Sequence, residues 1–204
     1  GLLLGQRVWP GVAVGAFLAN VTTNEPVLTA LGVATGNTLE ALTGAFMLHR
    51  FVRFNVRLER LKDVLGLVFF SAILSTMISA TVGVTSLCLG GVQPWASYQS
   101  LWLTWWLGDA AGALIVAPAL LAWGQKTDAW KQPKHLVRGT ALVGGLVIVC
   151  LSIFTDPPVL GITGHAFIYL IFPFIILAAL RFGQRGTTFV TLTASAIAIW
   201  ATLH

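Results

Sequence analysis

The sequence predicts an all-α fold, a polytopic transmembrane helix bundle with about seven membrane segments. The first reason is composition: 56% of the 204 residues are hydrophobic and 9% are charged, which leaves too few polar residues to cover a water-soluble domain. The second is charge distribution, because residues 64–108 contain no Asp, Glu, Lys, Arg or His. A chain with such long uncharged stretches needs a lipid bilayer as its solvent.

The lengths of the apolar stretches define the expected helices. A helix crosses a hydrocarbon core of roughly 30 Å with about 20 apolar residues. The segments that meet or approach this length are residues 8–21, 27–49, 64–88, 99–123, 138–153, 165–180 and 187–203. Because the chain begins and ends inside apolar runs, we expect a single integral-membrane domain over residues 1–204 that is truncated at both ends.

The loops between these segments alternate in charge. Lys and Arg occur in the loops at 50–63, 124–137 and 181–186, and the other three loops contain neither. Positively charged loops stay on the cytoplasmic side of a membrane, so these three loops are predicted to be cytoplasmic. The net charge of +5 is explained in this way, and nucleic acid is not expected as a partner.

The loop at 50–63 is the most basic of the three. Arg53, Arg57 and Arg60 lie in it beside two further cations. Such residues attract anionic lipid headgroups by about 1 kcal/mol each near the membrane surface. The loop therefore either holds lipid headgroups or serves only to fix the topology, and the sequence leaves both open.

Small residues recur at four-residue spacing, a pattern that lets helices approach closely in lipid. These stripes are Gly32, Gly36 and Gly44 in the second segment, Ser71, Ser75, Ser79 and Gly83 in the third, and Gly108 and Gly112 in the fourth. We expect a compact bundle.

Two acidic residues, Glu40 and Asp109, lie deep within apolar segments. A carboxylate at the centre of a bilayer costs about 3 kcal/mol on insertion scales, so such residues usually face the interior of a bundle. Asn37 precedes Glu40 by three residues and shares its helical face. We hypothesise that these three residues form a polar cluster that binds a ligand or a proton. The alternative is an interhelical hydrogen bond with a purely structural role.

Three tryptophans precede Asp109. Trp102 and Trp105 share its helical face, seven and four residues earlier, and Trp106 lies next to them in sequence. The indole rings could form the wall of a pocket around the carboxylate. Alternatively, they face lipid or pack in the core.

The sequence contains no motif for catalysis or metal binding. A Walker loop, a dinucleotide-binding fingerprint, a nucleophile elbow and a paired-cysteine zinc motif are all missing. Two histidine pairs, His49 with His135 and His165 with His204, make a haem conceivable but not favoured. We therefore expect no catalytic residue and no metal site, and the sequence does not identify a cofactor.

Five motifs occur along the chain in order. They are WPGVAVGAFLAN (9–20), GNTLEALTGAFMLHR (36–50), RLERLKDVLGLV (57–68), WWLGDAAGALIVAPALL (105–121) and RFGQRGTTFVTLTASAIAIWATLH (181–204). Together they resemble the first family of bacterial membrane-associated sensor (MASE) domains, over nearly the whole chain. The family pattern carries over onto Asn37, Glu40, Trp105, Trp106, Asp109, Pro118, Arg181, Gly183, Arg185 and Gly186.

The resemblance implies a non-enzymatic sensory input module, multi-pass in the bacterial inner membrane. Such a module passes a ligand, lipid or partner signal to a cytoplasmic output domain, a histidine kinase or a diguanylate cyclase. Membrane lipids, the output domain and a membrane protein are its expected partners, and a homodimer is its expected state. The alternative function is a secondary transporter that uses the intramembrane carboxylates.

Overall fold

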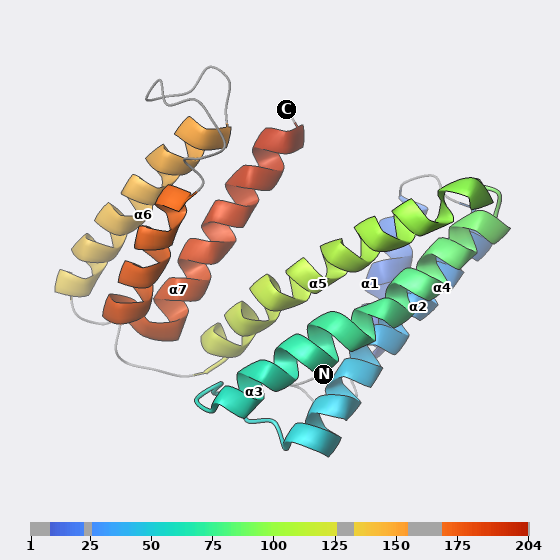
Figure 1. The fold of residues 1–204 in the computed structure, drawn as a ribbon, viewed down its shortest axis with the longest axis horizontal. Coiled ribbons are helices and arrows are strands. Elements are labelled where there is room, and N and C mark those ends of the chain that lie inside the picture. Colours follow the sequence, from blue (N-terminus) through green and yellow to red (C-terminus); the bar gives the residue numbers. More distant parts are fainter. Residues whose placement is uncertain (1–8, 23–25, 126–132, 155–168, 204) are drawn as a thin grey trace. The chain divides into compact units, whose positions relative to one another are not determined.

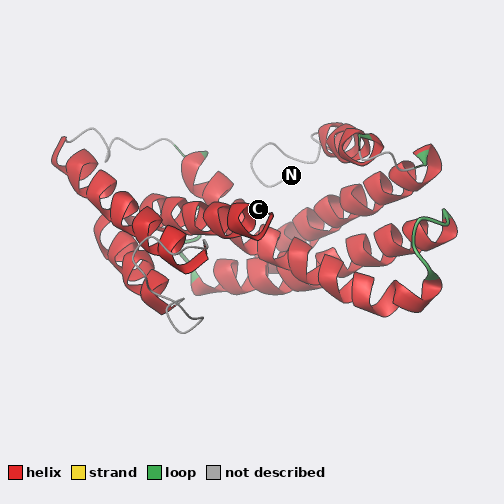
Figure 2. Ribbon diagram, turned by 90° about the horizontal axis from the view of Figure 1, so that it is seen from above, coloured by secondary structure: helices red, strands yellow, loops and turns green. Residues whose placement is uncertain are grey.

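The computed structural model describes residues 9–22, 26–125, 133–154 and 169–203. Helices dominate these ranges, and no strand occurs in them (Figures 1 and 2). The α-helices are α1 (Trp9–Val21), α2 (Val27–Met47), α3 (Leu61–Gly66), α4 (Thr76–Leu89), α5 (Tyr98–Trp123), α6 (Pro133–Phe154) and α7 (Ile171–Leu203). The predicted all-α fold is confirmed.

Short stretches of other helix types extend or join these helices. A π-helical turn, Leu48–Val52, continues α2, and a longer π-helical stretch, Leu67–Ser75, joins α3 to α4. The 3₁₀ turn Trp95–Ser97 leads into α5. The helical segments in residues 27–125 therefore begin and end within a few residues of the predicted ones.

Among the described residues, two helices are long and apolar enough to cross a membrane by length and composition, Leu61–Leu89 and Trp95–Trp123. The helix α2 has 21 residues, but Asn37 and Glu40 interrupt its apolar sequence. The helix α7 is broken at Gly183, whose backbone is not helical (φ 60°, ψ −155°). The prediction of about seven membrane segments is therefore not confirmed.

The chain folds as two compact units, Gly1–Leu114 and Ile115–His204. The helix α5 contributes residues to both. The prediction of one domain over residues 1–204 stays a prediction, and so do its cytoplasmic loops.

In the first unit, α2 packs against α4 through small residues. A Cβ atom placed on Gly36 would lie 3.1 Å from Val82 Cβ and 3.3 Å from the Ser79 carbonyl oxygen. One placed on Gly44 would lie 2.9 Å from Ser75 Oγ, at the end of the π-helical stretch that leads into α4. The two helix backbones approach this closely because neither stripe carries a large side chain.

In the second unit, α6 packs against α7 around an apolar core. Its buried residues are Leu142, Leu146, Cys150, Ala178, Val190 and Ala194. The break at Gly183 lies between Ala178 and Val190, so both halves of α7 contribute to this core. Phe174, in the first half, packs within 3.0 Å of the position that a Cβ on Gly145 would occupy.

Candidate functional site

A polar cluster joins three elements of the first unit. Ser79 on α4 donates a hydrogen bond from Oγ to Oδ1 of Asn37 on α2, at 2.7 Å. The Glu40 carboxyl group interacts with Ser79 and with Asp109 of α5. Asp109 in turn interacts with Ser79, Trp105 and Glu40. The structure thus brings together the three polar residues that the sequence singled out, with Ser79 between them.

One acceptor of the cluster lacks a hydrogen-bond donor. The Ser79 side chain is fully buried, and its hydroxyl group has one proton, which it donates to Asn37. Asp109 Oδ2 is buried and accepts no hydrogen bond within the described residues. A buried acceptor without a donor costs about 1–3 kcal/mol, so a proton or a polar group that reached Asp109 would stabilise the cluster.

The three tryptophans fasten α5 to the neighbouring helix. Trp106 Nε1 donates to the Ile73 carbonyl oxygen at 3.1 Å, and Trp102 Nε1 donates to Thr81 Oγ1 at 3.0 Å. The Trp102 and Trp106 rings stack, with centroids 5.8 Å apart. Trp105 interacts with the Asp109 carboxylate.

Trp105 also lies against a glycine of α4. A Cβ placed on Gly83 would come within 2.8 Å of the Trp105 ring, so the indole occupies the space that Gly83 leaves open. Trp105 is therefore the tryptophan that borders the cluster, whereas the indole hydrogen bonds of Trp102 and Trp106 go to other residues.

Sequence reasoning missed the central role of Ser79. It assigned this residue only to a packing stripe, together with Ser71 and Ser75. Ser75 Oγ donates to the Ser71 carbonyl oxygen of its own helix at 2.6 Å, whereas Ser79 Oγ reaches across to α2. Ser79 has the same four-residue spacing as Ser71 and Ser75, so spacing alone did not distinguish it from them.

In the basic loop, the side chains of Arg53, Arg57 and Arg60 are all exposed. Arg57 Nη1 lies 3.9 Å from Glu59 Oε1, and an exposed pair of this kind contributes little stability. Asp63 is fully buried, and its Oδ1 accepts a hydrogen bond from the Asn55 backbone at 3.0 Å. Asp63 holds the loop in shape, a role that the sequence did not reveal.

The family motif at 181–186 forms a turn and a helix cap in the second unit. Gly183 has a left-handed backbone (φ 60°), which a glycine adopts without strain. Two residues later, Arg185 Nε donates to the Ala122 carbonyl oxygen at 3.0 Å, and Nη2 donates to that of Gln125. Its guanidinium lies 5.7 Å from the centre of the Trp123 ring. Arg185 therefore caps the carboxyl end of α5, where carbonyl groups lack helical partners.

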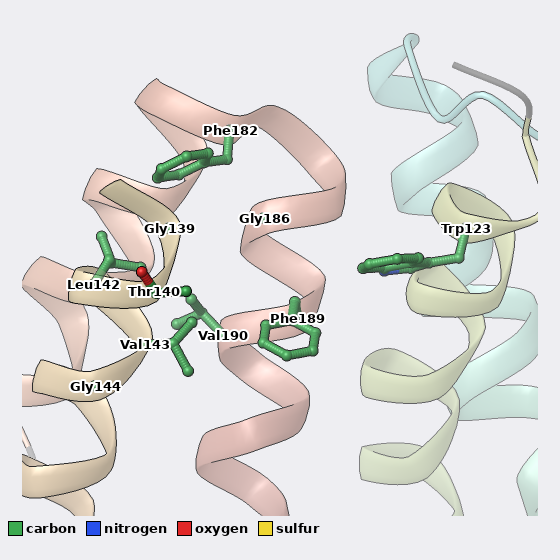
Figure 3. Close-up of a pocket in the computed structure, with 10 residues that line it drawn as sticks. All are labelled: Trp123, Gly139, Thr140, Leu142, Val143, Gly144, Phe182, Gly186, Phe189 and Val190. Atoms are coloured by element: carbon green, nitrogen blue, oxygen red, sulfur yellow. The ribbon is translucent and has the colours of Figure 1, made fainter. Parts of the chain in front are cut away.

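An apolar hollow of about 480 Å³ lies in the second unit. Figure 3 shows Leu142 and Val143 of α6 facing Phe182 and Phe189 of α7 around it. Thr140 is its most polar lining residue on α6. None of the described residues that line the hollow is acidic or basic, so its chemistry suits apolar groups.

Several sequence predictions concern residues that the structure does not describe. His165 and His204 lie outside the described residues, as does the His135 side chain, so neither histidine pair can be placed. Among the described residues, no group of three or more His, Cys, Asp or Glu side chains could hold a metal ion. The first eight residues and residues 126–132 of the loop 124–137 are also outside the described ranges.

The chain matches a known protein family over nearly its whole length. The MASE1 family model matches residues 2–204. The protein described as "Probable diguanylate cyclase DgcE" of Escherichia coli (strain K12) is 28% identical over 116 residues, which cover 55% of this chain and 10% of that protein. The chain thus matches about a tenth of the length of this relative. No solved structure matches.

Proposed function

The chain belongs to the MASE1 family of membrane sensor domains, and from this membership we propose how it senses and to what it is connected. As a sensory input domain, it is not itself an enzyme. We propose that it is a multi-pass domain of the bacterial inner membrane that controls a cytoplasmic output domain of the diguanylate cyclase or histidine kinase type. The similarity to a probable diguanylate cyclase supports the first of these outputs. The comparisons give no support to a transporter.

The observation that carries the proposed sensing mechanism is the buried Asp109 Oδ2, which accepts no hydrogen bond within the described residues. A signal shifts a protein between two states only by its differential affinity for them. A proton or a small polar ligand that supplied the missing hydrogen bond to Asp109 would favour the state in which α5 lies against Ser79 and Glu40. Loss of that ligand would favour a state in which α5 has moved away.

The contacts of α5 make it the element best suited to move. It meets α4 through indole rings and single hydrogen bonds, whereas α2 meets α4 through close backbone packing. The distance along α5 from Asp109 to Ala122 is about 20 Å at 1.5 Å per residue. Because Arg185 binds the carboxyl end of α5, a displacement of α5 would reach the turn at Gly183 and the second half of α7.

The family's expected partners fit this proposal. A diguanylate cyclase or histidine kinase output works as a pair, so we propose a homodimer. We also propose that a membrane protein or a lipid can supply the signal in place of a small molecule, and that Arg53, Arg57 and Arg60 contact lipid headgroups from the exposed loop.

The test compares Asp109→Asn and Glu40→Gln with Trp95→Phe in the complete protein that carries this chain. We expect both amide variants to change the basal output several-fold and to abolish its modulation, because an amide supplies its own donor. The control, which changes an exposed ring distant in sequence from the cluster, should leave output unchanged. Unaltered output and modulation in both amide variants would refute a sensing role for the cluster.

A further inference from the structure

A second candidate site lies on the α6–α7 pair, at the end where two arginines meet. A groove of about 440 Å³ is present there in the second unit. Its lining residues are Arg138, Ala141 and Leu142 of α6 with Phe174, Leu177, Arg181 and Phe182 of α7. The groove therefore combines two positive charges with an otherwise apolar wall.

Arg138 and Arg181 lie at the same end of the groove because α6 and α7 run antiparallel. Phe182 packs over Gly139, next to Arg138, and Phe174 packs over Gly145, further along α6. Six residues separate Gly139 from Gly145, which is about 9 Å of helix. From the arginine end, the groove thus continues for roughly that distance past apolar side chains.

Neither arginine side chain binds another described residue. The Arg138 and Arg181 side chains are exposed, and neither forms an ion pair or a hydrogen bond within the described part of the chain. Arg185, by contrast, uses its guanidinium to cap α5. Two of the three arginines in this unit are thus available for a ligand.

We propose that this groove binds an anionic phospholipid, with the phosphate on Arg138 and Arg181 and an acyl chain along Ala141, Leu142 and Leu177. A guanidinium presents a planar fork of donors that matches phosphate oxygens, and basic pockets between membrane helices bind anionic headgroups. A soluble anion would use the two arginines but would leave the apolar part of the groove empty. A neutral lipid would not use the charges.

The apolar hollow of Figure 3 extends the space for lipid. Leu142 and Phe182 line both that hollow and the groove. A turn of the Phe182 ring would therefore change the width of both. The site rests on the membrane location proposed above, but not on sensing by the Asp109 cluster.

The experiment measures how much lipid the full chain retains. The protein is reconstituted in phosphatidylcholine that contains phosphatidylglycerol and is then extracted in mild detergent. Native mass spectrometry reads the bound lipid. The double variant Arg138→Gln, Arg181→Gln is compared with the double variant Arg50→Gln, Lys62→Gln, which removes two exposed charges from the loop at 50–63 and leaves Arg53, Arg57 and Arg60 in place. We expect the first pair to lower bound phosphatidylglycerol roughly tenfold, about 1.4 kcal/mol. The second pair should lower it less than twofold.

A third variant tests the groove itself. Ala141→Trp keeps both arginines and fills the apolar wall, so it should also reduce phosphatidylglycerol retention several-fold without changing retention of phosphatidylcholine. Equal losses in the two charge pairs would mean diffuse electrostatic attraction and would overturn the site. Wild-type retention in Ala141→Trp would overturn the placement of the acyl chain. Since the readout is lipid mass, it is independent of any effect of Asp109 on output.

Discussion

The two faces of α4 contact their neighbouring helices in opposite ways. Toward α2, glycines and serines alternate and the backbones nearly touch, as the 3.3 Å from a Cβ on Gly36 to the Ser79 carbonyl oxygen illustrates. Toward α5, large indole rings fill the space and single hydrogen bonds join the helices. A backbone contact between small residues permits one arrangement, whereas a contact through long side chains permits several.

The difference matters because of the solvent proposed for this chain. In lipid, the hydrophobic effect does not drive helices to associate, so close packing and hydrogen bonds determine which helices stay together. The α2–α4 pair has close backbone packing and the hydrogen bond from Ser79 to Asn37, and it is suited to be the fixed frame. The helix α5 has fewer contacts and carries Asp109, and it is suited to be the part that responds.

The largest expected effect comes from breaking the tight interface. Gly36→Ala places a methyl group 3.1 Å from Val82 Cβ and 3.3 Å from a backbone oxygen, and the oxygen cannot move without its helix. Overpacking of this kind costs typically 1–3 kcal/mol, so we expect Gly36→Ala to lower the free energy of unfolding by about 2 kcal/mol. Thermal unfolding in detergent, followed by circular dichroism, measures it.

The matched control is Gly108→Ala on α5. No atom lies within 4 Å of the position that its Cβ would take, so the change should be neutral or slightly stabilising through helix propensity. If both alanine variants unfold at the same temperature, the contrast between the two interfaces is wrong.

A smaller effect is expected from removing the bond between α4 and α2. Ser79→Ala deletes the hydroxyl group that donates to Asn37 and leaves a partly buried acceptor without this partner, so we expect a loss of about 1–1.5 kcal/mol. Ser75→Ala is the control on the same helix, because Ser75 is equally buried but donates to its own helix. It should change stability by less than about 0.5 kcal/mol.

A double-mutant cycle of Ser79→Ala with Asn37→Ala isolates the bond itself. Hydrogen bonds between membrane helices give coupling energies that average about 0.6 kcal/mol and reach about 1.7. A coupling indistinguishable from zero would show that the 2.7 Å contact contributes nothing to holding α2 and α4 together.

The contrast also explains which features the sequence could predict. Helix positions follow from the length of apolar stretches, so the helix predicted at 27–49 lies close to α2 with its π-helical turn. The helix predicted at 64–88 begins earlier, at Leu61. Its first turn contains Asp63, whose charge suggested a loop but whose side chain accepts a hydrogen bond from that loop.

The candidate site was predictable in part for the same reason. Carboxylates deep in apolar segments are costly, which is why Glu40 and Asp109 stood out. A serine hydroxyl is cheap to bury because it can bond to its own helix, so Ser79 did not stand out from Ser75. The partners of Trp102 and Trp106 depend on which residues of the neighbouring helix lie opposite them, and spacing along α5 carries no information about that.

The smallest expected effect comes from loosening α5. Trp106→Phe keeps a large aromatic side chain but removes the donor to the Ile73 carbonyl oxygen. That carbonyl oxygen also lies 3.1 Å from Thr76 Oγ1, whose shorter bond, at 2.6 Å, goes to the Ala72 carbonyl oxygen. It therefore keeps a shared donor, and we expect a loss of about 0.5–1 kcal/mol. Hydrogen exchange should be more informative than global stability: amide protection should fall along α5 near residue 106 and stay unchanged in α2.

Trp95→Phe, which alters an exposed ring stacked on Tyr98, is the control. An equal fall of protection in α2 and α5 would mean that the three helices open as one unit, and α5 would then not be the separately mobile element that the proposed sensing mechanism requires.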